Sequence, residues 1–163
     1  MRDELAAPGG GAARAESATT DLPFDGVLFL CAANSARSQM AEAIAMRTFG
    51  DAVRVQSAGS APTRVHPLAV RAMAEVGIDI SAQSAKALDA VDLGAVDLAI
   101  TLCGDGGCPV PPRGVVHLHW PLPDPAAARP GDSHARQLDR FRAVRDELSE
   151  RIAALAAARR RKR

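Results

Sequence analysis

Aromatic residues are scarce in this chain of 163 residues: they make up 3 % of it, with one Trp and no Tyr. Proteins that bind single-stranded nucleic acid stack bases on aromatic rings, so this composition argues against that function. The charges are nearly balanced, with 20 Lys and Arg against 19 Asp and Glu, and no overall field favours nucleic acid or a membrane surface. We therefore expect neither as a partner, and we expect an aliphatic core.

Long hydrophobic runs are also missing. No apolar stretch approaches the roughly 18 residues of a membrane span, and the first residues, MRDELAAPGGGAARAE, lack the apolar centre of a secretory signal. These absences favour a cytoplasmic protein. Cysteine is rare as well, with three in the chain. Because the number is odd and no export signal precedes them, we interpret them as reactive thiols rather than as a disulfide framework.

The chain has about the length of one domain. Residues 1–23 are rich in Ala, Gly, Ser and Thr and show no periodicity, which is typical of a disordered leader. Residues 24–157 carry the patterns of a folded domain, and residues 158–163 form a basic tail ending in RRRKR. We interpret the tail as a solvated helix end, where cations suit the helix dipole, rather than as a nucleic-acid contact. A monomer is expected.

Within the domain, short apolar runs alternate with helical patterns. Strands are predicted at 26–30, 52–57, 96–102 and 115–119, and helices at 38–49, 67–76 and 133–157. Such alternation is typical of a single-domain α/β fold, here a four-stranded parallel sheet with helices on both faces. Ligands of these folds bind beyond the carboxyl ends of the strands, which is where Cys31, Cys103 and Trp120 fall.

The sequence CAANSARSQMAE at 31–42 links the first strand to the first helix. A loop that enters a helix N-terminus presents unpaired N–H groups beside the positive end of the helix dipole, and this favours an anion. The same field favours a thiolate, so Cys31 is the candidate nucleophile. Arg37 can hold two oxyanion oxygens through its planar guanidinium, and Ser38 can donate its hydroxyl to the thiolate. The residues expected to bind the substrate are Ala32, Ala33, Asn34, Ser35, Ala36, Arg37 and Ser38.

The stretch VLFLCAANSARSQMAEAIA resembles the phosphate-binding loop and first helix of the thioredoxin-coupled arsenate reductases, which share the low-molecular-weight protein tyrosine phosphatase fold. The resemblance continues through SAG at 57–59, GIDIS at 77–81, DLAITLC at 97–103, CPVPP at 108–112 and HWPLPDPA at 119–126. The loop is shared with phosphatases, whereas the two downstream cysteines and the HW and PDPA motifs are more specific to the reductases.

The resemblance implies an arsenate reductase that converts arsenate to arsenite. Cys31 would attack arsenate, with Asp124 as the general acid that protonates the leaving oxygen. Cys103 would then attack Cys31 to release arsenite, and Cys108 would attack Cys103 and leave a disulfide that reduced thioredoxin opens. No bound cofactor is implied. Phosphate and sulfate would compete as oxyanions. Whether thioredoxin, glutaredoxin or a small thiol is the preferred reductant stays open.

Two positions depart from the family pattern. Four residues, GDGG, separate Cys103 from Cys108, where better-known members have six, so a smaller rearrangement is expected. Some relatives bind potassium through residues that match Asn34, Glu42 and Ser57 and through an Asp that is Lys86 here. Because the lysine ammonium can take the place of the cation, we predict no potassium site, and we expect Asn34 to shape the loop through hydrogen bonds to the backbone.

Three alternatives are weighed against the reductase. Cys31, Arg37 and Asp124 alone would serve a phosphatase, but PDPAAARPG offers no aromatic residue to hold a phenyl ring. A non-catalytic domain that binds an oxyanion or responds to redox state would show no turnover. A metal site is conceivable in the pattern C-x(4)-C-x(8)-H-x-H, formed by Cys103, Cys108, His117 and His119. The resemblance assigns these cysteines and His119 to other motifs, so we predict no metal. His66 and His134 are interpreted as ordinary helix-start residues.

Overall fold

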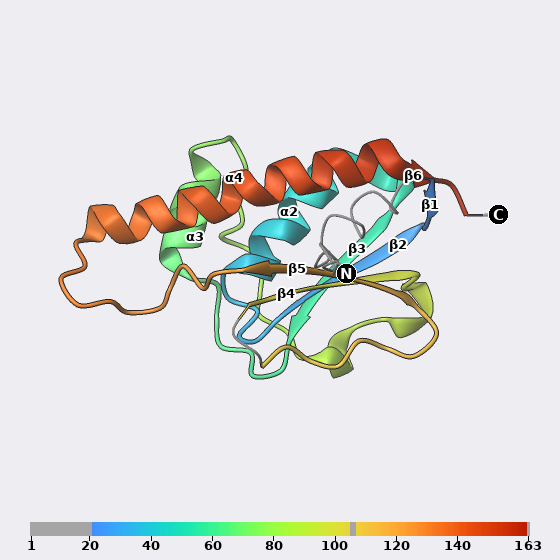
Figure 1. Cartoon of the computed structure of the whole chain (residues 1–163), viewed down its shortest axis with the longest axis horizontal. Coiled ribbons are helices and arrows are strands. Elements are labelled where there is room, and N and C mark those ends of the chain that lie inside the picture. The colour runs from blue at the N-terminus through green and yellow to red at the C-terminus, as the bar shows by residue number, and fades with distance from the viewer. Residues whose placement is uncertain (1–20, 105–106, 163) are drawn as a thin grey trace, which may run out of the picture.

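The computed structural model describes residues 21–104 and 107–162. Its centre is a four-stranded sheet in which every neighbouring pair is parallel, in the order β3-β2-β4-β5 (Figure 1). The strands are β2 (Gly26–Cys31), β3 (Arg54–Gly59), β4 (Leu98–Cys103) and β5 (Val116–Leu122). The expected fold class, α/β with a four-stranded parallel sheet, is confirmed.

Helices cover both faces of the sheet, but the α-helices and the short 3-10 helices lie on different faces. Three α-helices, α2 (Arg37–Phe49), α3 (Pro67–Ala74) and α4 (His134–Ala158), lie together on one side (Figure 1). The other side carries the single-turn 3-10 helices η2 (Leu88–Ala90) and η3 (Leu93–Ala95), and a further turn, η1 (Gly50–Ala52), follows α2. In the part of the chain that the structure describes, no helix combines the length and apolarity needed to cross a membrane.

Strand β2 explains why both faces are apolar, because its side chains alternate between the two sides of the sheet. Val27 and Phe29 join the larger core beneath the α-helices, whereas Leu28 and Leu30 join a smaller cluster on the face of η2 and η3. All six residues of β2 are buried. Burying a side chain of this size contributes about 1.5–3 kcal/mol, so β2 anchors both layers.

The strand order places the site. Strand β2 has β3 on one side and β4 on the other, so the chain reverses its winding direction at β2. Crevices at such a reversal, outside the carboxyl ends of the strands, are where ligands bind in open α/β sheets. Cys31 is the last residue of β2 and Cys103 the last of β4, so the topology brings two predicted thiols to one edge of the sheet.

Strand β3 ends two residues later than the sequence pattern predicts, because Ala58 and Gly59 stay in the sheet beside Leu30 and Cys31. The absence of a side chain at Gly59 is what permits this. A Cβ there would lie 2.5 Å from the Ala32 carbonyl oxygen and 2.7 Å from the Asn34 amide nitrogen. The glycine therefore lets the end of β3 pass against the anion loop instead of breaking the strand.

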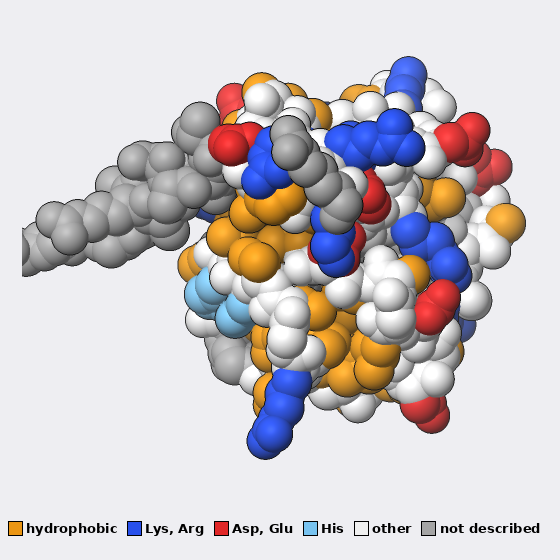
Figure 2. All heavy atoms as spheres, turned by 90° about the vertical axis from the view of Figure 1, so that its right-hand side faces the viewer, with side chains coloured by type: hydrophobic (Ala, Val, Ile, Leu, Met, Phe, Trp, Pro, Cys, Tyr) orange, Lys and Arg blue, Asp and Glu red, His pale blue; other side chains and the backbone are white. Residues whose placement is uncertain are grey.

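Both predicted domain boundaries move outward. Residues 1–20 of the expected leader lie outside the described residues, but Leu22–Pro23 forms strand β1, which pairs with strand β6 (Arg159–Arg160) in the expected basic tail. Arg159 donates to the Phe24 carbonyl and to Asp25, and Lys162 pairs with Asp97. Figure 2 shows basic and acidic side chains side by side at this end of the molecule. The start of the tail is thus docked on the domain rather than solvated.

A carboxylate ties α3 to α4. Glu75, which follows α3, accepts hydrogen bonds from Arg142 at 2.6 Å and from Arg145 at 2.9 Å, both on α4. The hydrogen bond from Arg142 is the largest cause that lowers the pKa of Glu75, to about 2. Because the pKa is below its usual value of 4.5, the ion pairs stabilise the fold above about pH 4.5 and are lost as the pH falls toward 2.

We expect Glu75→Gln to lower the melting temperature at pH 7 by a few degrees and to weaken the loss of stability between pH 4.5 and 2, the window set by the shifted pKa. Thermal unfolding followed by circular dichroism at a series of pH values measures both effects. The exposed Glu150 on α4 supplies the control Glu150→Gln. Equal acid dependence in wild type and Glu75→Gln contradicts the assignment.

Candidate active site

A cavity of about 360 Å³ opens at the carboxyl end of β2. It brings together the predicted nucleophile and the predicted arginine, which both belong to the stretch 31–42, and the predicted acid, which follows β5. Its lining residues are Cys31, Ala32, Ala33, Ser35, Ala36, Arg37, Thr63, His66, Asp124 and Ala126. Of the predicted loop residues, Asn34 and Ser38 are fully buried and lie behind this lining.

The loop at 32–36 turns its carbonyl groups outward. The carbonyls of Ala32, Ala33 and Ser35 accept hydrogen bonds from the backbone of residues 61, 63 and 66. Because the C=O and N–H of a trans peptide point in opposite directions, the N–H groups of the same peptides are directed toward the inside of the loop. Helix α2 also begins without a side-chain cap, so its first N–H groups stay available to an anion.

Asn34 holds the loop in this shape. Its φ of 46° lies in the left-handed region, which few residues other than Gly adopt, and Asn is one of them. Its side-chain oxygen accepts from Gln39 at 2.9 Å and from the Lys86 backbone at 2.8 Å. Its amide nitrogen donates to Ser38 at 2.7 Å and to Ser57 at 3.0 Å. The expectation that Asn34 bonds to backbone is therefore met in part, and side-chain partners complete its set.

These bonds fix the direction of the Ser38 hydroxyl. The amide nitrogen of Asn34 can only donate, so the Ser38 oxygen accepts from it and the Ser38 hydroxyl keeps its own proton for another partner. The Cys31 sulfur lies 2.8 Å from the Ser38 oxygen and can accept a hydrogen bond from the Ser38 hydroxyl. Cys31 is 2 % exposed, so this contact is shielded from bulk water. The arrangement gives a thiolate at Cys31 a preformed hydrogen-bond donor.

Lys86 lies on the far side of the same network. Its ammonium is 3.5 Å from the Glu42 carboxylate, and Glu42 also accepts the hydroxyl bond of Ser57 at 2.5 Å. A cation thus stands next to Glu42, at the position where some relatives are expected to hold potassium. This contact supports the interpretation that the lysine ammonium takes the place of a bound ion.

Arg37 and Asp124 both line the cavity, and both are held near the end of β5. Arg37 is 4 % exposed, and it donates to the backbone carbonyl of Leu122, the last residue of β5, at 3.0 Å. Asp124 follows two residues later, and one of its carboxylate oxygens accepts from the Ala126 N–H at 3.0 Å. The end of β5 therefore positions both groups, one through its carbonyl and one through the turn that follows it.

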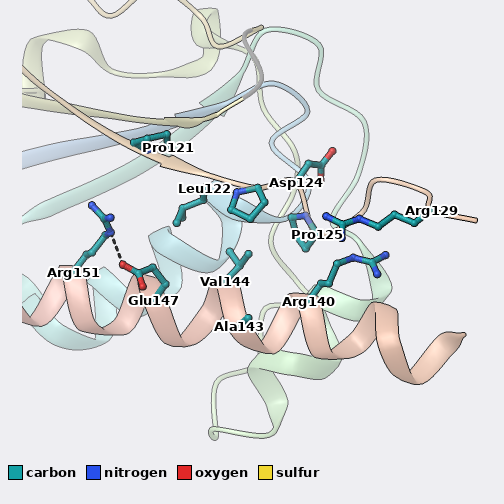
Figure 3. A pocket seen from close by; sticks show the side chains of 11 residues that line it. Pro121, Leu122, Asp124, Pro125, Arg129, Arg140, Ala143, Val144, Glu147 and Arg151 are labelled. Carbon is teal, nitrogen blue, oxygen red and sulfur yellow. Dashed lines mark hydrogen bonds and ion pairs between the residues drawn. The ribbon is translucent and has the colours of Figure 1, made fainter. Parts of the chain in front are cut away.

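A second groove, of about 490 Å³, lies between this turn and α4. Asp124 lines both cavities, but in Figure 3 its carboxyl points away from Arg140 and α4. Two of the groove's arginines are held in ion pairs: Arg151 pairs with Glu147 inside the groove, and Arg140 pairs with Asp132 outside its lining. Among the described residues that line this groove, none is a cysteine, whereas Cys31 lines the smaller cavity.

The other two cysteines, Cys103 and Cys108, form a disulfide with their Cα atoms 5.7 Å apart, and Cys31 is free. Four intervening residues are therefore enough to close this ring. The Cys108 sulfur lies 3.4 Å from the carbonyl oxygen of Leu30, the residue before Cys31. The structure thus places the disulfide beside the strand that ends in the free thiol.

The alternative metal site is not assembled. Two of its four residues are joined in the disulfide, and His117 and His119 both contact the hydroxyl of Thr101, at 2.8 and 2.7 Å. In residues 21–104 and 107–162, no group of three or more His, Cys, Asp or Glu side chains is arranged to hold a metal ion.

Comparison with known proteins agrees with this geometry. The sequence profile of the family described as low molecular weight phosphotyrosine protein phosphatase matches residues 26–163. The chain belongs to this family. The match covers the whole of the sheet, the cavity and α4, so the phosphatase fold expected from the sequence is confirmed.

Among the relatives of this phosphatase-family chain are arsenate reductases. One from Bacillus subtilis is 44 % identical over 128 residues, which cover 77 % of this chain and 91 % of the relative. A solved arsenate reductase in a phosphate-binding state is 37 % identical, with a TM-score of 0.69, and the match covers 82 % of this chain and 98 % of that one. A thioredoxin-dependent arsenate reductase of Corynebacterium glutamicum is 32 % identical, with a TM-score of 0.54, over 88 % of this chain and 72 % of that one. Within the family, the chain is therefore grouped with the reductases, as its downstream motifs predict.

Sequence reasoning missed three residues of the cavity: Thr63, His66 and Ala126. The pattern Val-His-Pro at 65–67 marks a helix start, because Pro is favoured at the first helical position. It thus predicts the helix-start role of His66 but not its place in the cavity. That place follows from the hydrogen bond between the His66 backbone N–H and the Ser35 carbonyl, which no sequence pattern reveals.

We expect Ser38→Ala to slow the alkylation of Cys31 by iodoacetamide at neutral pH about 10-fold, because the thiolate loses a hydrogen-bond donor. The protein is used with its Cys103–Cys108 disulfide intact, so that Cys31 is the free thiol that reacts. Ser149→Ala, whose hydroxyl bonds to a carbonyl within α4, is the matched control. An unchanged rate in Ser38→Ala would show that the hydroxyl does not assist the thiolate.

Proposed function

We propose that the chain reduces arsenate to arsenite through a relay of Cys31, Cys103 and Cys108. The observation that carries this proposal is the redox arrangement of the three thiols: Cys31 is free in an anion-binding loop, and the other two are joined beside it. Of the three cysteines, a phosphatase of the same fold needs only the one in the loop. Two further cysteines that pair next to the loop are what a reductase requires.

The first step is nucleophilic substitution at arsenic. Arsenate lies in the loop, with its oxygens on the inward N–H groups and on the guanidinium of Arg37. The Cys31 thiolate forms a sulfur–arsenic bond. The bond from arsenic to one arsenate hydroxyl breaks, and that hydroxyl leaves as water with the proton that Asp124 supplies. The hydrogen bond from Ser38 holds the sulfur as a thiolate until it attacks.

The second step moves the electrons. The Cys103 thiolate attacks the Cys31 sulfur, the sulfur–arsenic bond breaks, and its electron pair stays on arsenic, which leaves as arsenite. Cys108 then attacks Cys103 and expels the Cys31 thiolate. The product is the Cys103–Cys108 disulfide with a free Cys31, and this is the thiol state of the structure. Cys103 and Cys31 end adjacent strands, which supports the first exchange.

We propose reduced thioredoxin as the electron donor. The thioredoxin-dependent reductase of Corynebacterium glutamicum supports this assignment. Cys103 is buried, but Cys108 is half-buried and lies two residues before Val110, which is 82 % exposed. Cys108 is therefore the sulfur that we propose a donor protein contacts. Glutaredoxin and a small thiol are the competing donors, and the assay below separates them.

A phosphatase activity is the second candidate, because the family is named for it and the cavity holds Cys31, Arg37 and Asp124. The cavity offers little to an aryl group. Among the described residues that line it, none carries a phenyl, phenol or indole ring. We therefore expect weak hydrolysis of p-nitrophenyl phosphate relative to arsenate reduction.

We expect steady arsenate-dependent oxidation of NADPH when the protein is combined with thioredoxin and thioredoxin reductase. Cys31→Ser abolishes turnover because the nucleophile is lost. Cys108→Ser releases about one arsenite per chain and accumulates the Cys31–Cys103 disulfide, because nothing resolves it. Peptide mapping after a single addition of arsenate identifies the disulfide.

Parallel assays with glutaredoxin and glutathione, and with dithiothreitol, identify the preferred donor. Multiple turnovers by Cys108→Ser with thioredoxin as the only reductant would falsify the relay. Release of phosphate from p-nitrophenyl phosphate without any arsenite formation would make the chain a phosphatase, and no activity with either substrate would make it an oxyanion-binding domain.

A further inference from the structure

His66 is tied to two elements of the site at once. Its backbone N–H donates to the Ser35 carbonyl of the anion loop at 3.0 Å. Its ring nitrogen Nδ1 accepts the N–H of Leu68 at 3.0 Å, so the side chain caps α3. The ring also packs against Phe141 of α4, with ring centroids 4.8 Å apart. These contacts fix where the imidazole lies and how it is turned.

The cap also fixes the tautomer. A backbone N–H can only donate, so Nδ1 must carry no proton, and the proton of the neutral ring is on Nε2. Protonating Nδ1 would set two N–H groups against each other and break the cap. Burial lowers the pKa of His66, the Asp124 carboxylate opposes this, and Arg64 adds to it, with a net lowering. The ring is therefore neutral at pH 7.

The remaining nitrogen serves the cavity. His66 lines the same cavity as Cys31, Arg37 and Asp124, and in the described part of the chain Nε2 has no hydrogen-bond partner. Helix α4 places the apolar ring of Phe141 against the imidazole. The charged groups that act on it are Asp124 and Arg64, and Arg37 lines the same cavity. A neutral N–H donor thus stands beside the anion loop and the carboxyl of Asp124.

Neutrality matters for the chemistry. An imidazolium beside Asp124 would stabilise its carboxylate and keep it from holding the proton that the leaving oxygen needs. A neutral Nε2–H can bond to an oxyanion without that effect. We propose that His66 binds the oxyanion directly through Nε2–H, as a further substrate-binding residue whose tautomer is set by the cap on α3. This assignment rests on the oxyanion site of the proposed function.

The test compares two substitutions that separate the two ring nitrogens. Asn is a good helix cap but is too short to replace Nε2, so His66→Asn keeps the cap and removes the donor. Gln is a poor cap but can place an amide N–H near the position of Nε2. The measurement is the dissociation constant of inorganic phosphate, by calorimetry on fully reduced protein, with thermal unfolding in parallel. His134→Asn, at the start of α4 and outside the cavity, is the matched control.

We expect His66→Asn to bind phosphate about 10- to 100-fold more weakly, because a hydrogen bond to a charged group is lost. Its melting temperature falls only by the lost packing against Phe141, because the cap on α3 is kept. His66→Gln should bind more tightly than His66→Asn while melting at a lower temperature. Phosphate affinity equal to wild type in His66→Asn, or weaker binding by His66→Gln than by His66→Asn, overturns the proposal. Phosphate binding needs no turnover, so this comparison decides the role of His66 even where wild type reduces no arsenate.

Discussion

The site depends on the buried side-chain amide of Asn34. An amide offers two donors and two acceptor lone pairs, and all four are engaged, with Ser38, Ser57, Gln39 and the backbone of Lys86. A buried donor or acceptor left unpaired costs about 1–3 kcal/mol, so the four bonds together fix one conformation. That conformation is the left-handed turn that directs the loop amides inward. The anion loop therefore needs no bound ligand to keep its shape.

The same amide sets the chemistry of the thiol. Because it donates to Ser38, the serine proton is left for Cys31, and because it donates to Ser57, the second serine turns its proton to Glu42. Lys86 balances the buried carboxylate of Glu42. One hydrogen-bonded network thus links the Lys86–Glu42 ion pair on one side to Cys31, the proposed nucleophile, on the other. A change in any member alters the direction of the next hydroxyl.

Parallel strands supply the distances that the thiols need. Cys31 and Cys103 end neighbouring strands, and Cys108 reaches back to the edge of β2 near Leu30. The pairing of β2 with β4 is enough to place Cys31 near Cys103, and no further contact is needed for it. The short loop between the paired cysteines then decides which two sulfurs are joined. The position of His66 is set by elements outside the sheet. Its side chain caps α3 and its backbone N–H donates to the anion loop, and together these hydrogen bonds hold the ring at the cavity.

Local sequence was enough for much of this. Alternating apolar residues predict the four strands, and a thiol, small residues and Arg37 at a strand-to-helix junction predict an anion loop, because these features act within a few residues of one another. The later end of β3 was not predictable in this way: Gly59 looks like a strand breaker until the backbone of Ala32 and Asn34 is seen against it. The basic tail was likewise misassigned, since its partners Asp25 and Asp97 are more than 60 residues away along the chain.

The sequence by itself determined which groups we propose to react: Cys31, Arg37, Asp124 and two further cysteines in motifs specific enough to indicate a reductase. Only the tertiary structure decided how they work together. The strand order put Cys103 beside Cys31, the network of Asn34 turned the Ser38 proton toward sulfur, and the start of α3 brought His66 to the same cavity. The reason is physical: residue type sets which bonds a group can make, but hydrogen-bond direction and distance depend on elements that are far apart in the chain.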